Sequence, residues 1–74
     1  DRAEADAGLR RGIAVHEDAG LRIEAARTRL HLALLCRRWG QADRAAALYE
    51  AAAGAFAECG CDYALGEARR LWQG

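Results

Sequence analysis

The sequence predicts an all-α protein built from antiparallel helical hairpins, and three observations lead to that prediction. Helix-favouring alanine, leucine, arginine and glutamate dominate the chain, which contains no proline. Gly20, Gly40 and Gly60 stand at equal intervals along it. A glycine just past a helix end adopts the left-handed conformation at little cost, so each is expected to end one helix. Short turns between long helices make antiparallel neighbours.

These glycines divide the chain of 74 residues into four expected helices. They run from Arg2 to Asp18, from Arg22 to Trp39, from Ala42 to Glu58, and from Asp62 to the end of the chain. A chain of this length makes one small domain, residues 1–74, that buries only about 60% of its unfolded surface. We therefore expect a small core and a marginal free energy of unfolding.

The helix on each side of Gly40 carries one stripe of packing residues. After the glycine, spacings of three and four place one set on a single face: Ala45, Tyr49, Ala52 and Phe56. Before it, the facing stripe consists of Leu32, Ala33, Cys36 and Trp39. Large residues meet small ones across this hairpin, as dense packing requires.

A repeat of about 40 residues underlies the spacing of the glycines. Five positions of the first helix match the third helix at a shift of 40: Ala5, Leu9, Gly12, Ile13 and His16. After Gly60 the best shift is 41, with Arg27–Leu30 falling on Ala68–Leu71. Two helices per repeat of this length are typical of a helical solenoid. The chain then divides into a half repeat (1–20), a full repeat (21–60) and a second half repeat (61–74).

The residues around Gly40 resemble the tetratricopeptide repeat family. Leu32-Ala33, Cys36, Gly40, Ala45, Tyr49 and Ala52 have the spacing of that motif, although Cys36 replaces the usual aromatic residue and the final proline is missing. The length near 40 residues is similar to the extended repeats of large bacterial transcription regulators of the maltose-activator type and related signalling proteins. The resemblance implies a right-handed solenoid fragment of about two repeats. The absence of an initial methionine also suggests a piece of a longer protein.

The same resemblance implies a non-enzymatic scaffold that binds a protein or peptide in a groove lined by the first helix of each repeat. Carried over by position, the partner-binding residues are Arg27, Leu30, Leu34, Arg37 and Arg38, extended by Arg69 and Arg70. Guanidinium groups bind carboxylates in a two-pronged geometry, so an acidic, partly apolar peptide is the expected partner. The alternative reading, that these arginines form only a solvated helix face, stays open.

Composition argues against other classes of function. Without lysine or serine the chain has no phosphate-binding loop, no Schiff-base lysine and no serine triad, so we expect no enzyme. A formal net charge of zero argues against nucleic acid or anionic membranes as partners. No run approaches the ~20 apolar residues of a membrane span. An odd number of cysteines fits a secreted disulfide framework poorly, which favours a cytoplasmic location.

Cys59 and Cys61 form one close pair where a zinc site commonly needs two, so no metal and no cofactor are predicted. A cysteine-based metal or redox sensor is the least favoured alternative. His16 is expected at a half-buried packing position, and His31 at the groove rim or in solvent.

Self-association is the main alternative to a groove ligand. Solenoids need about three repeats before neighbouring units cover each other's faces. Leu9 and Ile13 near one end of the chain, and Trp72 near the other, are the apolar residues expected to mediate a homodimer.

Overall fold

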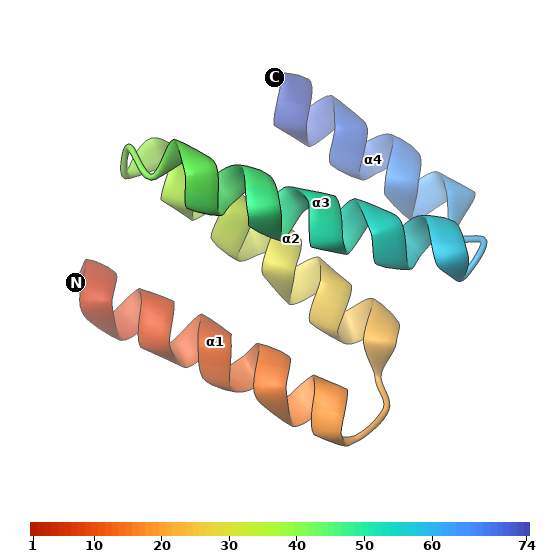
Figure 1. Ribbon diagram of the computed structural model, residues 1–74, viewed down its shortest axis with the longest axis horizontal. Coiled ribbons are helices and arrows are strands. Elements are labelled where there is room, and N and C mark those ends of the chain that lie inside the picture. Colours follow the sequence, from red (N-terminus) through yellow and green to blue (C-terminus); the bar gives the residue numbers. More distant parts are fainter.

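The computed structural model describes all 74 residues and contains four helices and no strand, which confirms the all-α class. The helices are α1 (Arg2–Asp18), α2 (Arg22–Arg38), α3 (Ala42–Glu58) and α4 (Asp62–Gln73). They follow the expected bounds closely, with α2 ending one residue earlier because Trp39 takes the capping position. Each helix runs antiparallel to the one before it (Figure 1).

The three turns are built in the same way. Gly20, Gly40 and Gly60 have positive φ angles of 76°, 81° and 69°. At the turn after α2, the Gly40 amide donates to the Arg37 carbonyl and the Gln41 amide donates to the Cys36 carbonyl. Equivalent pairs of bonds close α1 and α3, and this pattern is a Schellman motif. The motif satisfies helix-end carbonyl groups and reverses the chain within a few residues.

No extra residue enters the third turn. α2 begins at Arg22 and α4 at Asp62, which are 40 positions apart like their glycines. The shift of 41 that matches Arg27–Leu30 to Ala68–Leu71 therefore does not describe the structural register. Residues of α4 correspond to residues of α2 at a constant spacing of 40.

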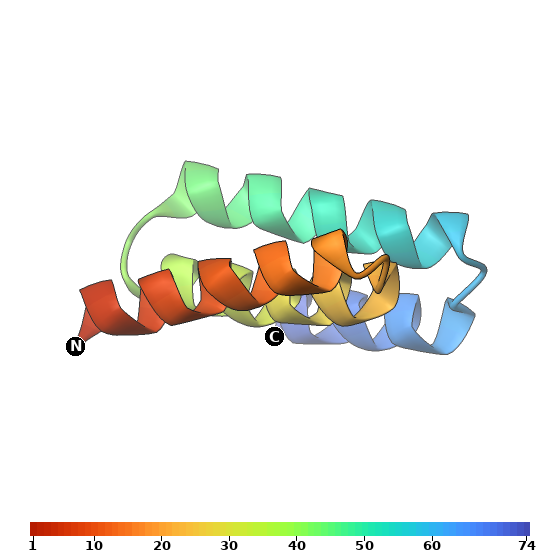
Figure 2. The ribbon, with the colours of Figure 1, turned by 90° about the horizontal axis from the view of Figure 1, so that it is seen from below.

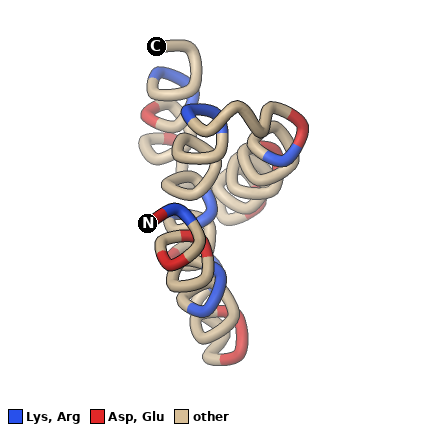
Figure 3. The backbone as a smooth tube through the Cα atoms, turned by 90° about the vertical axis from the view of Figure 1, so that its left-hand side faces the viewer, with Lys and Arg blue, Asp and Glu red and all other residues tan.

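The helices pack in chain order, α1 on α2, α2 on α3, and α3 on α4, and the α2–α3 contact is the most extensive. When the molecule is viewed from below, α3 lies on one level and α2 and α4 lie on another (Figure 2). The molecule is thin, with extents of 34 × 30 × 15 Å. Every helix carries both basic and acidic positions (Figure 3). None of the four helices is long and apolar enough to cross a bilayer.

The core is small and consists of small residues. Ten residues are buried, all of them apolar, and six of the ten are alanines. One cluster joins α1, α2 and α3 around Ile13, Leu32 and Cys36, and the other joins α2, α3 and α4 around Phe56. Short alanine side chains allow dense packing between helices. Phe56 is the only fully buried aromatic residue.

The residues expected on the α2–α3 stripes occupy two kinds of position. Those that are buried are Leu32, Ala33, Cys36, Ala45, Ala52 and Phe56. Tyr49 and Trp39 are half-buried. Tyr49 stacks on Trp72 of α4. The stripe on α3 therefore contacts both α2 and α4.

Candidate functional site

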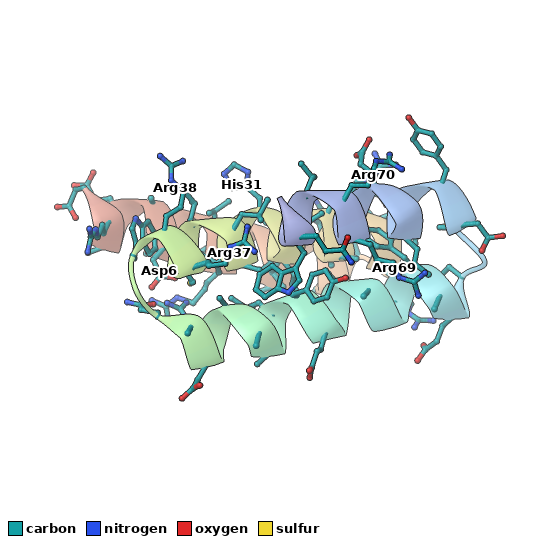
Figure 4. All side chains as sticks on the ribbon, turned by 90° about the horizontal axis from the view of Figure 1, so that it is seen from above. Asp6, His31, Arg37, Arg38, Arg69 and Arg70 are labelled. Carbon is teal, nitrogen blue, oxygen red and sulfur yellow. The ribbon has the colours of Figure 1, made fainter.

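The partner-binding residues named from the sequence lie on α2 and α4, and the structure separates them into two groups. Arg38 and His31 of α2 and Arg70 of α4 point to the same open side, away from α3 (Figure 4). Arg27, His31, Leu34 and Arg38 follow one another at spacings of three and four, so they form one stripe of α2. We call Arg27, Leu30, His31, Leu34, Arg38 and Arg70 together the α2–α4 face.

Two of the named arginines do not point to this open side. Arg37 and Arg69 point toward the level of α3 (Figure 4). The Arg37 guanidinium lies 4.5 Å from the centroid of the Trp72 ring and donates hydrogen bonds to the carbonyl oxygens of Trp72 and Leu71. Arg37 therefore satisfies carbonyl groups at the C-terminal end of α4 and holds this end against α2.

None of the three arginines of the α2–α4 face has a carboxylate partner, whereas four of the other eight arginines have one. Arg10, Arg22, Arg29 and Arg44 each form an ion pair. Arg2 lies over Trp39, with 5.9 Å from guanidinium carbon to ring centroid. The arginines with neither an ion pair nor a hydrogen bond nor an aromatic partner are Arg11, Arg27, Arg38, Arg69 and Arg70. Four of these five belong to the partner-binding set.

A shallow hollow of about 190 Å³ opens between α2 and α4 at one end of this face. Leu30, Phe56 and Ala64 supply apolar lining, and Arg27, Tyr63 and Glu67 complete the lining. Leu30 and Leu34 are half-buried, so part of each leucine side chain remains exposed to solvent. The face thus combines unpaired guanidinium groups with a small apolar depression.

Larger hollows lie elsewhere, between α1 and α3 over α2. One hollow of about 410 Å³ has an apolar floor that includes Ile13, Leu32 and Leu48. The next, of about 470 Å³, is lined by alanines, Gly54 and five charged residues. They share Arg29 and Ala51, so they form one continuous trough, which we call the α1–α3 groove. This groove was not predicted from the sequence.

Ion pairs connect the helices that form the groove. At one end Asp6 of α1 accepts hydrogen bonds from Arg44 of α3, at 2.6 and 2.9 Å, and pairs with Arg10 at 3.3 Å. At the other end, Arg29 of α2 pairs with Glu17 of α1, and Arg22 pairs with Glu58 of α3. The remaining carboxylate of this end, Glu50, has no ion-pair partner.

These contacts change the protonation equilibria of the charged groups. The hydrogen bonds from Arg44, strengthened by the charges of Arg44 and Arg10, hold the pKa of Asp6 below its usual value. The same hydrogen bonds raise the pKa of Arg44. The hydrogen bond to Glu58 raises the pKa of Arg22. All three shifts favour the charged forms, so the ion pairs persist across neutral pH.

Cysteine and histidine positions are scattered. Cys36 is buried, Cys61 is half-buried and Cys59 is exposed, and all three are free thiols. His31 is exposed, whereas His16 is half-buried with its Nδ1 atom covered and without a hydrogen-bond partner. No group of three or more histidine, cysteine or acidic side chains has the arrangement of a metal site.

Comparison of the chain with protein-family models, with curated proteins and with solved structures gave no match.

Proposed function

We propose that the chain is a non-enzymatic protein-interaction module whose α2–α4 face binds an acidic, partly apolar peptide. The proposal rests on the arginines of this face, which have no ion-pair partner within the chain. Arg27, Arg38 and Arg70 have no carboxylate partner within the chain, whereas four other arginines are each bound to one. Guanidinium groups free of internal partners are available to the carboxylates of a ligand.

The neighbouring apolar groups fit the same kind of ligand. Leu30 and Leu34 are half-buried on α2, and the hollow beside Arg27 is large enough for a single side chain of the peptide. In this arrangement the leucines and the hollow contribute apolar contact, and the arginines select for negative charge. Arg37 acts indirectly, because it fixes the last turn of α4 and with it the position of Arg70.

A peptide titration followed by fluorescence anisotropy tests this proposal. The probe is a labelled peptide of alternating glutamate and leucine residues, compared with a peptide in which glutamine replaces each glutamate. We expect the acidic peptide to bind more tightly and to weaken as salt rises, because exposed charge pairs are screened. Equal affinity of the two peptides would contradict the proposal.

Single substitutions assign the binding to the α2–α4 face. Arg38→Gln and Arg70→Gln should each weaken binding of the acidic peptide by about two- to fivefold, the usual worth of an exposed ion pair. Arg11→Gln is the matched control, because Arg11 is also exposed and unpaired but belongs to α1. If Arg11→Gln weakens binding as much as the other two, the attraction is general and the face is not a specific site.

The repeated spacing supports the tetratricopeptide-like, right-handed solenoid arrangement as part of this proposal. Three identical turns 20 residues apart make each pair of helices a structural unit of 40 residues. Together with the resemblance around Gly40, this supports origin in a bacterial regulatory or signalling protein. Three free thiols fit a reducing, cytoplasmic compartment. The sequence adjoining this segment in its full-length protein tests the origin: an ATPase or DNA-binding domain is expected there.

Self-association remains a second candidate, favoured by exposed apolar side chains on the outer helices. Tyr63 and Leu71 of α4 are 81% and 47% exposed, and Val15 of α1 is 64% exposed. The residues expected from the sequence to mediate dimers are more covered, since Ile13 is buried and Leu9 and Trp72 are half-buried. Sedimentation equilibrium in reductant separates the candidates: a dimer dissolved by Tyr63→Gln would favour self-association, and a monomer of 8.0 kDa at all concentrations would exclude it.

A further inference from the structure

The α1–α3 groove carries a distribution of charge that the proposed peptide face does not explain. At one end, Arg10 and Arg44 share the single carboxylate of Asp6, which leaves one positive charge in excess. At the other end, three glutamates (Glu17, Glu50 and Glu58) face two arginines (Arg22 and Arg29), which leaves one negative charge. Between the ends lies the apolar floor around Ile13, Leu32 and Leu48.

The helix dipoles of the two walls reinforce this polarity. α1 and α3 run in the same direction (Figure 1), so both N-termini lie toward Arg10 and Arg44. Each helix N-terminus carries a partial positive charge of about half a unit, and each C-terminus a similar negative charge. Fixed charges and dipoles therefore have the same sign at each end of the groove.

From this polarity we infer that the α1–α3 groove is a docking site for an amphipathic α-helix of a partner protein, which runs antiparallel to α1 and α3. In that direction the positive N-terminus of the bound helix lies at the end of the groove that holds the glutamates, and its negative C-terminus lies toward Arg10 and Arg44. A basic side chain in its first turn pairs with Glu50, the carboxylate without an internal partner. Leucine-type side chains on its apolar face fill the hollow over Leu32 and Leu48.

The walls of the groove permit the close approach of such a helix. Half of the eight α3 residues that line the groove are small and project little beyond the helix backbone: Ala47, Ala51, Gly54 and Ala55. The bound helix would lie beside α1 and α3 and across from α2, as the fourth member of an antiparallel bundle. This surface is separate from the α2–α4 face, and the inference holds whether or not that face binds an acidic peptide.

Two synthetic peptides test the direction of binding. Both have about 15 residues, a length at which an isolated helix is marginal, and leucines at spacings of three and four. The forward peptide has arginines in its first turn and glutamates in its last, and the reversed peptide exchanges them. The reversed peptide is the better helix on its own, because its charges complement its own dipole. Preference for the forward peptide, expected to be at least about fivefold, therefore reports the groove and not peptide helicity.

Gly54→Leu tests the location. A Cβ atom added at Gly54 meets no atom within 4 Å, so leucine is accommodated there and fills the groove. We expect this variant to fold with an unchanged or higher melting temperature, since leucine favours helix more than glycine does. It should no longer bind the forward peptide. Gly8→Leu is the matched control: Gly8 is equally unobstructed on α1 but lies outside the groove, so binding should persist.

Glu50→Gln tests the charge contact. This variant should bind the forward peptide about two- to fivefold more weakly, whereas Glu67→Gln on α4 should leave the affinity unchanged. The inference is overturned if the reversed peptide binds as tightly as the forward one, or if folded Gly54→Leu still binds. It is also overturned if the protein forms a dimer that Gly54→Leu dissolves, because the occupant would then be a second copy of this chain.

Discussion

Tyr49 and Trp72 stack face to face, with ring centroids 4.5 Å apart and ring planes within 9° of parallel, and this pair joins the middle of α3 to the last turn of α4. The guanidinium of Arg37 approaches the same indole ring from α2. α4 has only one buried residue, Ala68, so much of its attachment depends on Trp72. Because Arg70 lies on this helix, the stack also helps to fix the α2–α4 face.

Trp72→Ala should loosen α4 and lower the free energy of unfolding by about 1–3 kcal/mol. This is less than the ~3–5 kcal/mol typical of a fully buried tryptophan, because Trp72 is only half-buried, and it includes the lost stacking and cation–π contacts. Chemical denaturation measures the change, and faster amide exchange should be confined to α4. Leu71→Ala, at an exposed position, should have little effect; equal losses for both variants would contradict a special role for the stack.

Ala45→Leu should destabilise the chain by overpacking the contact between α2 and α3. Ala45 is fully buried in the cluster with Leu32 and Cys36, so extra methylene groups force neighbouring side chains or backbone to move. A cost of about 1–3 kcal/mol is expected. Ala57→Leu, exposed on the same helix, should stay within about 0.5 kcal/mol of the parent chain. An unchanged thermal melt for Ala45→Leu would show that this contact is not closely packed.

Two glycine-to-alanine substitutions should act in opposite directions. Gly40 has φ +81°, so a Cβ atom there strains the turn, and Gly40→Ala should cost about 1–2 kcal/mol. Gly54 lies inside α3 with open space around it, so Gly54→Ala should stabilise the helix by up to about 1 kcal/mol. Urea denaturation of both variants gives the comparison. Loss of stability in Gly54→Ala would mean that the α1–α3 groove is more tightly filled than the structure shows.

The sequence was sufficient for the helices and turns because those features depend on nearby residues. A glycine in the left-handed region ends a helix through hydrogen bonds within six residues, and the same motif occurs at Gly20, Gly40 and Gly60. Spacings of three and four also placed Leu32 and Cys36 on one stripe, and both are buried. Such local rules do not depend on how one helix is set against another.

The α1–α3 groove and the stack of Tyr49 on Trp72 depend on that setting. Tyr49 was expected to fill the seam with α2, and its ring stacks on Trp72 of α4. Arg37 was expected to face a ligand, and instead it binds the carbonyl of Trp72, 35 positions away. One local signal for the groove was present: Gly54 and its neighbouring alanines are too small to cover the adjacent surface of α3.

The pH dependence of stability should include a contribution from Asp6. Because Arg44 and Arg10 lower the pKa of Asp6 in the folded chain, ionised Asp6 stabilises the fold above the pKa of the unfolded chain, about 3.9. This stabilisation is lost as pH falls through the lower, folded pKa. Asp6→Asn should therefore lower the melting temperature near neutral pH, and the difference from the parent chain should shrink below about pH 4.

Glu67→Gln is a control for this pH profile, because Glu67 forms no ion pair. Its melting temperature should follow that of the parent chain at neutral and acidic pH. If the difference between Asp6→Asn and the parent chain persists unchanged in acid, the ion pair of Asp6 with Arg44 is not its source.

An NMR titration of the isotope-labelled chain with the glutamate–leucine peptide locates the bound peptide on the chain. Amide shifts show which helix surface the peptide contacts without any substitution. We expect the largest changes along α2 at Arg27, His31, Leu34 and Arg38 and near Arg70 of α4, with α1 unaffected. Changes confined to α1 and the groove side of α3, or no saturable change at all, would contradict the assignment of the α2–α4 face as a binding site for acidic peptides.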